Sequence, residues 1–391
     1  MWTKKATHLE TADLPQGHLN FIERNPSFIK HHRASSERVA NALSRYAKSE
    51  VVEEQNICKL VVKMTSSCNL RCEQCFQWRE GGFHNGLDPT AIPYDESGNL
   101  FDFIDRNKCD IILTGGEPTL HPDFPKFFRR LAEAGCFIYI CTNGLLIKRY
   151  FELFSEFSDQ LAFLISIDGP GEIHDSIRGK GTFRKTIQGI EMLAKGKKEE
   201  GKGWLIGVEN TLMAKNLDQS IELLQICEKH GVDWMIFNHL WVVDLFARSE
   251  YHKFCEDYDV VPNSYTGFDM GDFSPEYIEK VITTLSALRE YPAQIPVLFG
   301  PDYSDDELRK YYRGKMPARE NYLKMGVKLD VDIGGKLVMT KQFPDLVFGS
   351  VLDDTLEDLM ASDAYQRAAK SMREGSLRVL NACPDAHNFL V

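Results

Sequence analysis

The sequence predicts an α/β fold that is built from parallel βα units. From residue 58 onward, short runs rich in β-branched and aromatic residues alternate with stretches of helical periodicity. This alternation is typical of parallel strands that are joined by helices. The apolar share of 43% is that of an ordinary globular core, and 391 residues suffice for one large domain with an appendage.

Six strands are expected, with helices between them. The expected strands are Lys59–Met64, Asp110–Leu113, Phe137–Cys141, Leu161–Ile167, Trp204–Leu212 and Trp234–Phe237. Helical patterns include Phe124–Ala134, Phe183–Lys195, Asp218–His230 and, further on, Pro275–Arg289. Functional groups of parallel sheets gather at the carboxyl ends of the strands. The motifs that follow these strands are therefore the candidates for a site.

Three cysteines follow the first expected strand at a Cys-x3-Cys-x2-Cys spacing, namely Cys68, Cys72 and Cys75. One loop of this kind can wrap three thiolates around a face of an iron–sulfur cube. A [4Fe–4S] cluster usually takes four thiolates, so three leave one iron for a ligand that is not protein. A structural zinc site remains an alternative, although no second Cys or His pair follows. Buried inert thiols are a further alternative, and a disulfide framework is disfavoured by the long chain without a secretory signal.

The cysteine loop resembles the signature of the radical S-adenosylmethionine enzymes. In that family three cysteines hold a [4Fe–4S] cluster, and the free iron chelates the amino and carboxylate groups of S-adenosylmethionine. The resemblance implies reductive cleavage to a 5′-deoxyadenosyl radical, which abstracts a hydrogen atom from substrate. It also implies a partial (β/α)6 TIM-like barrel. The family often has an aromatic residue or His before the last cysteine, where this chain has Gln74.

Two motifs at the next strand ends resemble parts of the family's S-adenosylmethionine pocket. The first is Gly115-Gly116-Glu117-Pro118, whose glycines permit an approach of backbone that any side chain would block. In the family this turn receives the methionyl amino group. The second is Thr142-Asn143-Gly144, which supplies hydrogen-bonding groups and a tight turn. Each motif alone also fits a plain turn.

Two more motifs follow the fourth and fifth expected strands. The resemblance implies that Ser166 binds the ribose or the carboxylate, that Arg178 binds the methionyl carboxylate through its two-pronged donor, and that Asp168 faces substrate. It also implies that Asn210 lies in a stretch that contacts adenine. Taken singly, each residue fits a turn or strand pairing equally well. Their order along the chain is what carries the resemblance.

The resemblance divides the chain into four parts. Before the barrel we expect a polar leader whose helix begins near Ser35-Ser36-Glu37 and packs on the outside of the barrel. His239 and Trp241 follow the last barrel strand, where they either line a substrate pocket or belong to the core. The expected parts are a helical leader at 1–57, the core barrel at 58–240, a substrate-covering segment at 241–326 and a C-terminal extension at 327–391.

The extension is expected to form a hairpin around Gly334-Gly335, followed by a helix through Met372. It resembles the SPASM or twitch extension of the family, which holds auxiliary iron–sulfur clusters. Here Met339 and Thr340 stand where cysteine follows the hairpin in that extension, and the tail keeps only Cys383. We therefore expect a degenerate extension without auxiliary metal. Cys383 is either a hydrogen-atom donor to a substrate radical or a buried relic.

The remaining cysteines lie beside apolar residues and are expected to be small buried hydrophobes; they are Cys58, Cys109, Cys136, Cys141, Cys227 and Cys255. The net charge of −11 argues against nucleic acid as a partner. No apolar run approaches the roughly 18–20 residues that span a bilayer. A cytoplasmic location is expected, because few cysteines at no framework spacing fit a reducing compartment.

The expected reaction partners are a small-molecule substrate and a one-electron donor such as flavodoxin or ferredoxin. The substrate is expected to be a sugar, nucleoside, aminocyclitol or lipid-like intermediate that undergoes epimerisation, rearrangement or dehydrogenation. One alternative is a maturase that modifies a ribosomal peptide. The other is a non-catalytic iron–sulfur scaffold.

Overall fold

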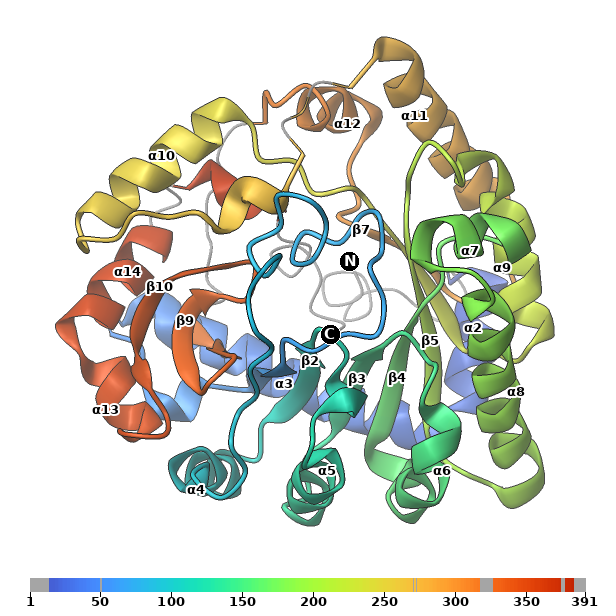
Figure 1. Ribbon diagram of the computed structural model, residues 1–391. Coiled ribbons are helices and arrows are strands. Elements are labelled where there is room, and N and C mark those ends of the chain that lie inside the picture. Colours follow the sequence, from blue (N-terminus) through green and yellow to red (C-terminus); the bar gives the residue numbers. More distant parts are fainter. Residues whose placement is uncertain are drawn as a thin grey trace.

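The computed structural model of the chain describes residues 14–49, 51–269, 271, 273–316, 326–373 and 377–382. Its centre is a ten-stranded sheet in the order β10-β9-β8-β1-β2-β3-β4-β5-β6-β7 (Figure 1). All neighbours from β8 to β7 are parallel, whereas β9 pairs antiparallel with both β8 and β10. The strands are β1 (Lys59–Thr65), β2 (Asp110–Gly115), β3 (Ile138–Thr142), β4 (Leu161–Ser166), β5 (Leu205–Thr211), β6 (Trp234–Asn238), β7 (Val297–Gly300), β8 (Lys328–Asp332), β9 (Lys336–Thr340) and β10 (Phe343–Ser350).

Helices surround this sheet, which curls into an open barrel because β7 and β10 remain as its two edges. The predicted partial barrel with a C-terminal hairpin-plus-helix extension is thereby confirmed. The helices are α2 (Gln16–Arg24), α3 (Pro26–Lys48), α4 (Gly98–Asn107), α5 (Phe124–Glu133), α6 (Ile147–Glu156), α7 (Gly171–Arg178), α8 (Thr182–Glu200), α9 (Ser220–Lys229), α10 (Leu245–Glu256), α11 (Pro275–Glu290), α12 (Asp305–Tyr311), α13 (Leu356–Ala361) and α14 (Asp363–Arg373).

The six predicted strands correspond to β1–β6, with ends that differ by at most two residues. Two further parallel strands extend the barrel on either side. β7 lies in the segment expected to cover the substrate, and β8 is the first strand of the predicted hairpin. The parallel pairing of β8 with β1 joins the extension to the barrel sheet.

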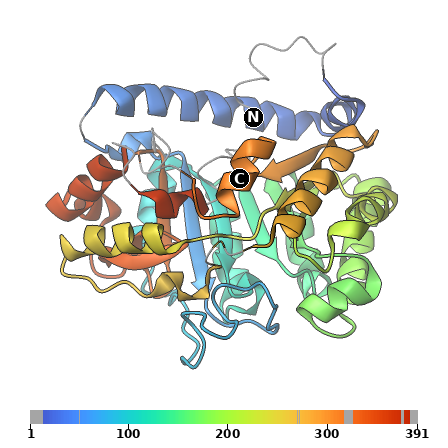
Figure 2. The ribbon, with the colours of Figure 1, turned by 90° about the horizontal axis from the view of Figure 1, so that it is seen from above.

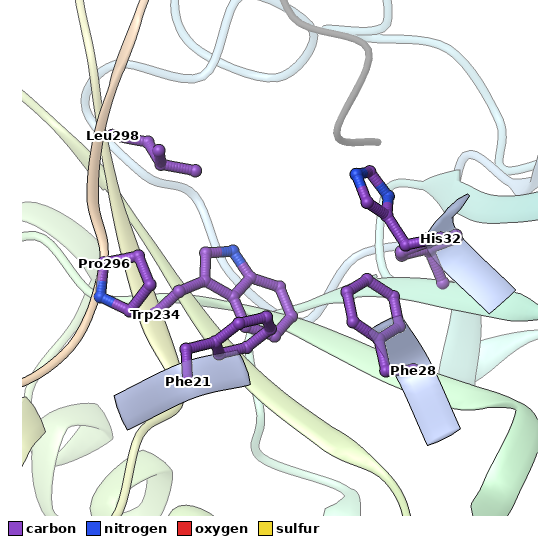
Figure 3. A pocket seen from close by; sticks show the side chains of 7 residues that line it. Phe21, Phe28, His32, Trp234, Pro296 and Leu298 are labelled. Carbon is purple, nitrogen blue, oxygen red and sulfur yellow. The ribbon is translucent and has the colours of Figure 1, made fainter. Parts of the chain in front are cut away.

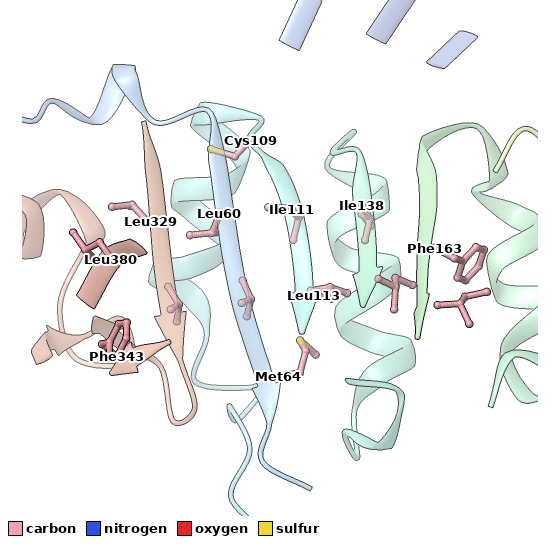
Figure 4. Close-up of a cluster of buried hydrophobic side chains, with 14 of the residues drawn as sticks. Leu60, Met64, Cys109, Ile111, Leu113, Ile138, Phe163, Leu329, Phe343 and Leu380 are labelled. Carbon is pink, nitrogen blue, oxygen red and sulfur yellow. The ribbon is translucent and has the colours of Figure 1, made fainter. Parts of the chain in front are cut away.

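Alternating side chains divide the core into two layers. Leu60, Met64 and Leu113 belong to the large cluster between the sheet and its outer helices, part of which Figure 4 shows. Val61 and Ile112 belong to a second cluster, on the inner face of the curled sheet. The period of two along β1 therefore separates an outward face from an inward one.

The inner cluster is closed by α2 and α3. Phe21, Phe28 and Ile29 from these helices pack against inward side chains of the strands. Figure 2 shows α3 lying across the end at which the strands begin. The prediction that the leader packs on the outside of the barrel is wrong, because its apolar face covers the inner layer. A small apolar hollow lies beneath these helices, lined in part by Phe21, Phe28 and Trp234 (Figure 3).

The predicted helix start at Ser35-Ser36-Glu37 is also wrong, since these residues lie in the middle of α3. The helix begins at Pro26, and proline is favoured in the first turn because that N–H needs no partner. Ser35 is buried and donates a hydrogen bond of 2.5 Å to Asp110 Oδ2 at the start of β2. Its hydroxyl fixes α3 to the sheet and caps no helix.

The region after β6 links the two edges of the sheet. The backbone N–H groups of Asn263 and Ser264 donate to the carboxylate of Asp345 on β10, at 2.8 and 3.1 Å. The ring of Phe268 stacks on Phe343 with centroids 5.1 Å apart. The expected helix through Met372 is two helices, because extended backbone at Ser362 separates α13 from α14.

The buried cysteines are as predicted, except that Cys141 is only half-buried. His239 is buried, and its ring nitrogens lie 2.8 Å from Tyr312 Oη and 3.1 Å from Pro301 O, which supports the core alternative for this residue. No helix within the described part of the chain has the length and apolar character that crossing a membrane requires.

Asp110 gives a test of how α3 is held. Burial alone would raise the pKa of its carboxyl, but His31, Lys59 and Ser35 outweigh burial and hold the pKa below its usual value. A depressed pKa contributes stability above the unfolded value of about 4, and that stability is lost as the pH falls through the folded value. We predict that Asp110→Asn lowers the free energy of unfolding by about 1–3 kcal/mol at pH 7.

Urea denaturation at pH 7 and in acid measures this effect, and the exposed Asp353→Asn serves as the control. The difference between Asp110→Asn and the parent should shrink in acid, where the carboxyl is protonated in the parent too. Equal stability of the two proteins at pH 7 would contradict this role for Asp110.

Candidate functional site

The predicted motifs lie together at the rim where the parallel strands end, opposite α3. The segment between β1 and α4 carries the three cysteines and lies over the middle of the barrel (Figure 1). Carboxyl ends of parallel strands share one rim, so residues more than 100 positions apart in sequence meet there.

The cysteine loop is held by local turns and by its neighbours. The N–H of Cys75 donates to Cys72 O at 3.1 Å, and the N–H of Leu70 donates to Cys68 Sγ at 3.4 Å. All three cysteines are half-buried. Phe76, directly after Cys75, packs against Trp241 and Phe268 with ring centroids 4.7 and 5.0 Å apart. These rings attach the loop to the segment that follows β6.

The thiols lie close enough to influence one another. Burial, with smaller contributions from the neighbouring Glu117, Cys72 and Cys75, raises the pKa of the Cys68 thiol to about 12, although the hydrogen bond from Leu70 N opposes this shift. Burial also raises the pKa of the Cys72 thiol, whereas the Arg178 guanidinium lowers it. Thiolates bind metals and thiols do not, so a metal group must displace these protons when it binds.

The Gly115-Gly116 turn packs against the backbone that leads into this loop. The N–H of Gly116 donates to Thr65 O, and the N–H of Glu117 donates to Ser67 O, both at 2.8 Å. A Cβ atom on Gly115 would lie 2.3 Å from Thr65 O, and one on Gly116 would lie 2.3 Å from Ser67 O. The close backbone approach that the two glycines predicted is therefore made to the cysteine loop.

Glu117 joins the turn after β2 to the turn after β3. Its carboxylate is buried and accepts hydrogen bonds from Thr119 N and Oγ1, from Thr142 Oγ1 and from Asn143 N, at 2.5–3.2 Å. Burial raises the pKa of this carboxyl, and the four hydrogen bonds oppose that shift. The side chain of Asn143 in turn donates to Asn69 Oδ1 of the cysteine loop at 2.8 Å.

Asp168 and Arg178 form a buried ion pair beside the cysteines. Arg178 Nε lies 2.6 Å from Asp168 Oδ2, and the Asp168 side chain is 0% exposed. The same oxygen accepts a hydrogen bond from the Gln74 side chain, while Asp168 Oδ1 accepts one from Thr211 N at 2.9 Å. Arg178 Nη1 also lies 3.7 Å from Cys72 Sγ. A cation is thus fixed next to one thiol of the loop.

The other predicted site residues lie on the same rim. Ser166 ends β4, is half-buried and pairs in register with Glu209 of β5. Asn210 is buried and donates to Ile167 O at 3.1 Å, while its Oδ1 has no hydrogen-bond partner among the described residues. Pro118 is buried in a short 3-10 helix after Glu117. Cys383 lies outside the described residues.

The donor set fits an iron–sulfur cluster better than a single ion. Within the described ranges, no three His, Cys, Asp or Glu side chains are grouped so that they could hold one metal ion. The ligands of a cluster need not meet at one point, because each thiolate binds a different iron. Three half-buried thiols on one loop, beside a fixed cation, fit this arrangement.

Sequence reasoning missed two features of this rim. The first is the contact of Gln74 with Asp168, which joins residues 94 positions apart. The second is Lys63, a buried cation on β1 whose ammonium lies 2.7 Å from Asp332 Oδ1 on β8. The signal for Lys63 was present in the sequence, since one lysine interrupts the apolar run of a buried strand.

Residues 62–210 match the profile of the Radical SAM superfamily. The chain contains a radical SAM domain. The matched range holds the three cysteines and every predicted strand-end residue from Gly115 to Asn210. Proteins of this superfamily use a [4Fe–4S] cluster and S-adenosylmethionine.

Curated relatives are similar over the same part of the chain. A heme synthase dependent on S-adenosylmethionine, from Oleidesulfovibrio alaskensis, is 30% identical over 185 residues, which cover 46% of this chain and 45% of that protein. The mycofactocin maturase MftC of Mycolicibacterium smegmatis is 25% identical over 174 residues, which cover 44% and 42%. The chain thus spans less than half the length of these relatives.

Solved structures of SuiB from Streptococcus suis share the fold. The complex with the precursor peptide SuiA has a TM-score of 0.58 and 15% identity, and the match covers 89% of this chain and 75% of that chain. The complex with S-adenosylmethionine has a TM-score of 0.56 and 16% identity, with 89% and 76% covered. The likeness extends beyond the radical SAM domain to most of the chain.

The contact of the Gly-Gly turn with the cysteine loop gives a prediction for the radical SAM domain. Gly116→Ala places a methyl group against backbone oxygens that cannot rotate away. We expect the free energy of unfolding to fall by about 1–3 kcal/mol, as for overpacking elsewhere. The loop thiols should also react faster with a thiol reagent, because the loop is displaced.

Gly98→Ala is the matched control, because a Cβ atom at Gly98 meets nothing within 4 Å. Thermal unfolding and the rate of thiol labelling, measured on both variants, check the prediction. Parent-like stability and labelling of Gly116→Ala would show that the turn does not hold the loop.

Proposed function

We propose that this chain is a radical S-adenosylmethionine enzyme whose cluster is held by Cys68, Cys72 and Cys75. The observation that carries the proposal is the placement of three thiols on one loop that is hydrogen-bonded to the Gly115-Gly116 turn at the rim of a partial barrel. The match to the superfamily over residues 62–210 supports it. A cofactor could bind between the cysteine loop and the Gly115-Gly116 turn, because both lie at the same rim of the barrel.

Cys68, Cys72 and Cys75 would hold three irons of a [4Fe–4S] cluster and leave one iron for a ligand that is not protein, which would be S-adenosylmethionine. Such a cluster would supply the electron for reductive cleavage of S-adenosylmethionine and thereby a radical able to take a hydrogen atom from substrate. The residues proposed to surround S-adenosylmethionine are Gly115, Gly116, Glu117, Pro118, Thr142, Asn143, Ser166, Asp168, Arg178 and Asn210.

We assign two tasks to the residues of the chain itself: they bind the cofactor and they orient it. Arg178 is held by Asp168 and offers its remaining N–H groups to an anionic group such as a carboxylate. Glu117 is satisfied within the protein, so we assign it to holding the turns that approach the cofactor. The barrel excludes water and keeps the reacting groups close, which limits side reactions of a radical.

For the substrate, we propose a small biosynthetic intermediate such as a sugar, nucleoside, aminocyclitol or lipid-like precursor. The outcome would be epimerisation, rearrangement or dehydrogenation. A redox-neutral outcome is favoured, because an extension without auxiliary clusters offers no second site for the electron that an oxidation releases. The similarity to heme synthases supports a small-molecule substrate.

The second candidate is a peptide maturase. The similarity to the maturase MftC favours it, as does the hairpin-plus-helix extension formed by β8, β9, β10, α13 and α14. A non-catalytic iron–sulfur scaffold is the third. A scaffold would bind a cluster but form no 5′-deoxyadenosine. Both candidate enzymes would form it, so an assay for this product distinguishes the scaffold from them.

We further propose that the segment 241–326 covers the substrate and that 327–391 is a degenerate extension without metal. A one-electron donor such as flavodoxin or ferredoxin would reduce the cluster. Nucleic acid is not a proposed partner, because the chain carries a net charge of −11. A reducing cytoplasm would suit both the cluster and the free thiols.

Replacing any one of Cys68, Cys72 or Cys75 by Ala should remove the cluster and its chemistry together. We expect iron content after anaerobic reconstitution to fall to background and 5′-deoxyadenosine to be absent with reductant and S-adenosylmethionine. Cys136→Ala is the control, since Cys136 is buried beside β3 at the opposite end of the barrel. A loop variant that retains the parent's iron and product would refute the proposed ligand set.

We propose Cys383 as the donor of a hydrogen atom to the substrate radical, which rests on its position as the one cysteine of the tail. Cys383→Ala should then form 5′-deoxyadenosine as the parent does while net conversion of substrate is lost. Conversion at the parent's rate would rule out this role.

A further inference from the structure

A buried lysine faces the inside of the barrel near the proposed cofactor site. Leu60, Val62 and Met64 of β1 belong to the outer cluster, whereas Val61 belongs to the inner one. The alternation along a strand therefore directs Lys63 inward, two residues before the end of β1. Its side chain is only 1% exposed. A buried ammonium is costly unless its N–H groups are paired.

Among the described residues Lys63 has one charged partner, and its ammonium also lies 5.3 Å from the centroid of the Phe83 ring. Its Nζ lies 2.7 Å from Oδ1 of Asp332, whose side chain is 11% exposed. Within the described part of the chain, neither atom has a partner with hydrogen-bond geometry. An ammonium carries three donors and a carboxylate offers about four acceptor sites. Most of the hydrogen-bonding capacity of this pair is therefore not used by any residue that the structure describes.

Two more groups with unused capacity lie beside the pair. The imidazole Nε2 of His84 is buried without a partner among the described residues, and burial together with Lys63 lowers the His84 pKa to about 4. Asp330 is 3% exposed and sits one inward position before Asp332 on β8. Its Oδ2 lies 3.0 Å from Lys328 Nζ, but its Oδ1 has no hydrogen-bond partner in the described ranges.

A second Lys–Asp pair in this protein, whose lysine side chain is 21% exposed and whose aspartate side chain is 8% exposed, shows what a purely structural pair looks like. Lys197 Nζ lies 2.7 and 2.6 Å from the two oxygens of Asp233 and 3.2 Å from Asn25 Oδ1. Asp233 also accepts a hydrogen bond of 2.8 Å from Ile206 N. Protein groups complete that pair, which lies at the opposite rim, just before β6 begins. Within the described ranges, no protein group forms a comparable hydrogen bond to Lys63 Nζ or to Asp332 Oδ1.

The charges and hydrogen-bonding groups around Lys63 and Asp332 indicate which kind of ligand group could bind to them. Lys63 offsets Asp332, and Lys328 offsets Asp330, so the surroundings carry no net charge. A bare anion or cation would be desolvated there without a counter-charge of its own. A neutral group that both donates and accepts can serve the lysine and the carboxylates at once. Carboxamides and hydroxyls have this property.

We propose that Lys63, Asp332 and His84 form a substrate subsite that binds a neutral group able to donate and accept hydrogen bonds, a carboxamide or a hydroxyl. This inference rests on the proposed function, because it assigns the subsite to the substrate of the radical reaction. The N–H of His84 donates to Gln77 O at 2.9 Å, and Gln77 follows Cys75 by two residues, so the subsite adjoins the segment that carries the cysteines. A carboxamide corresponds to a peptide substrate and a hydroxyl to a sugar-like one.

Four small probes test the subsite without knowledge of the substrate: acetamide, ethylene glycol, acetate and methylammonium. Their dissociation constants for the reconstituted protein with S-adenosylmethionine are measured by ligand-observed NMR titration. The variants are Lys63→Met and Asp332→Asn, with Lys197→Met as the matched control. We expect acetamide or ethylene glycol to bind the parent best, and about tenfold more weakly to Lys63→Met, as for a lost hydrogen bond to a charged group.

Binding of the neutral probe to Lys197→Met should match the parent. The tighter of the two neutral probes identifies the group, and hence the class of substrate. Equal affinities of the parent and Lys63→Met would overturn the subsite, and tighter binding of acetate or methylammonium would overturn its assigned chemistry. Formation of 5′-deoxyadenosine is measured separately, so a failure of the radical chemistry is distinguished from a failure of the subsite.

Discussion

The contact between the Gly-Gly turn and the backbone before the cysteines organises the rest of the site. Backbone groups of Gly116 and Glu117 bond to backbone oxygens at the end of β1, and the missing Cβ atoms allow that distance. The Glu117 carboxylate then holds the turn after β3. Three successive strand ends thus form one hydrogen-bonded unit, which is why a long loop can present three thiols in a defined place.

The buried charged side chains at the rim differ in how many hydrogen-bond partners they have within the described protein. Asp168 is satisfied by Arg178, Gln74 and a backbone N–H, and it fixes the guanidinium beside Cys72. Lys63 and Asp332, by contrast, use little of their hydrogen-bonding capacity with the residues that the structure describes. Proteins accept such local violations of good packing at functional sites and compensate for them elsewhere. We therefore assign Asp168 and Arg178 to holding the site in shape, and Lys63 and Asp332 to binding a ligand.

The repeating pattern of the barrel was readable from sequence, whereas its long-range contacts were not. β1–β6 follow from apolar runs and strand-end motifs, because period and turn chemistry are local properties. The parallel pairing of β8 with β1 and the contact of Gln74 with Asp168 join residues far apart, and nothing local encodes them. The start of α3 was misplaced because Ser35 reads as a cap locally but bonds to Asp110 across the sheet.

We propose that Cys68, Cys72 and Cys75 hold a cluster whose fourth iron binds S-adenosylmethionine. Electron–nuclear double resonance of the reduced, reconstituted protein tests it most directly, with S-adenosylmethionine labelled at the methionyl nitrogen and carboxylate. The account predicts a [4Fe–4S] signal that changes on addition of S-adenosylmethionine and shows coupling to both labels. A cluster signal that is unchanged by S-adenosylmethionine and uncoupled from the labels would contradict it.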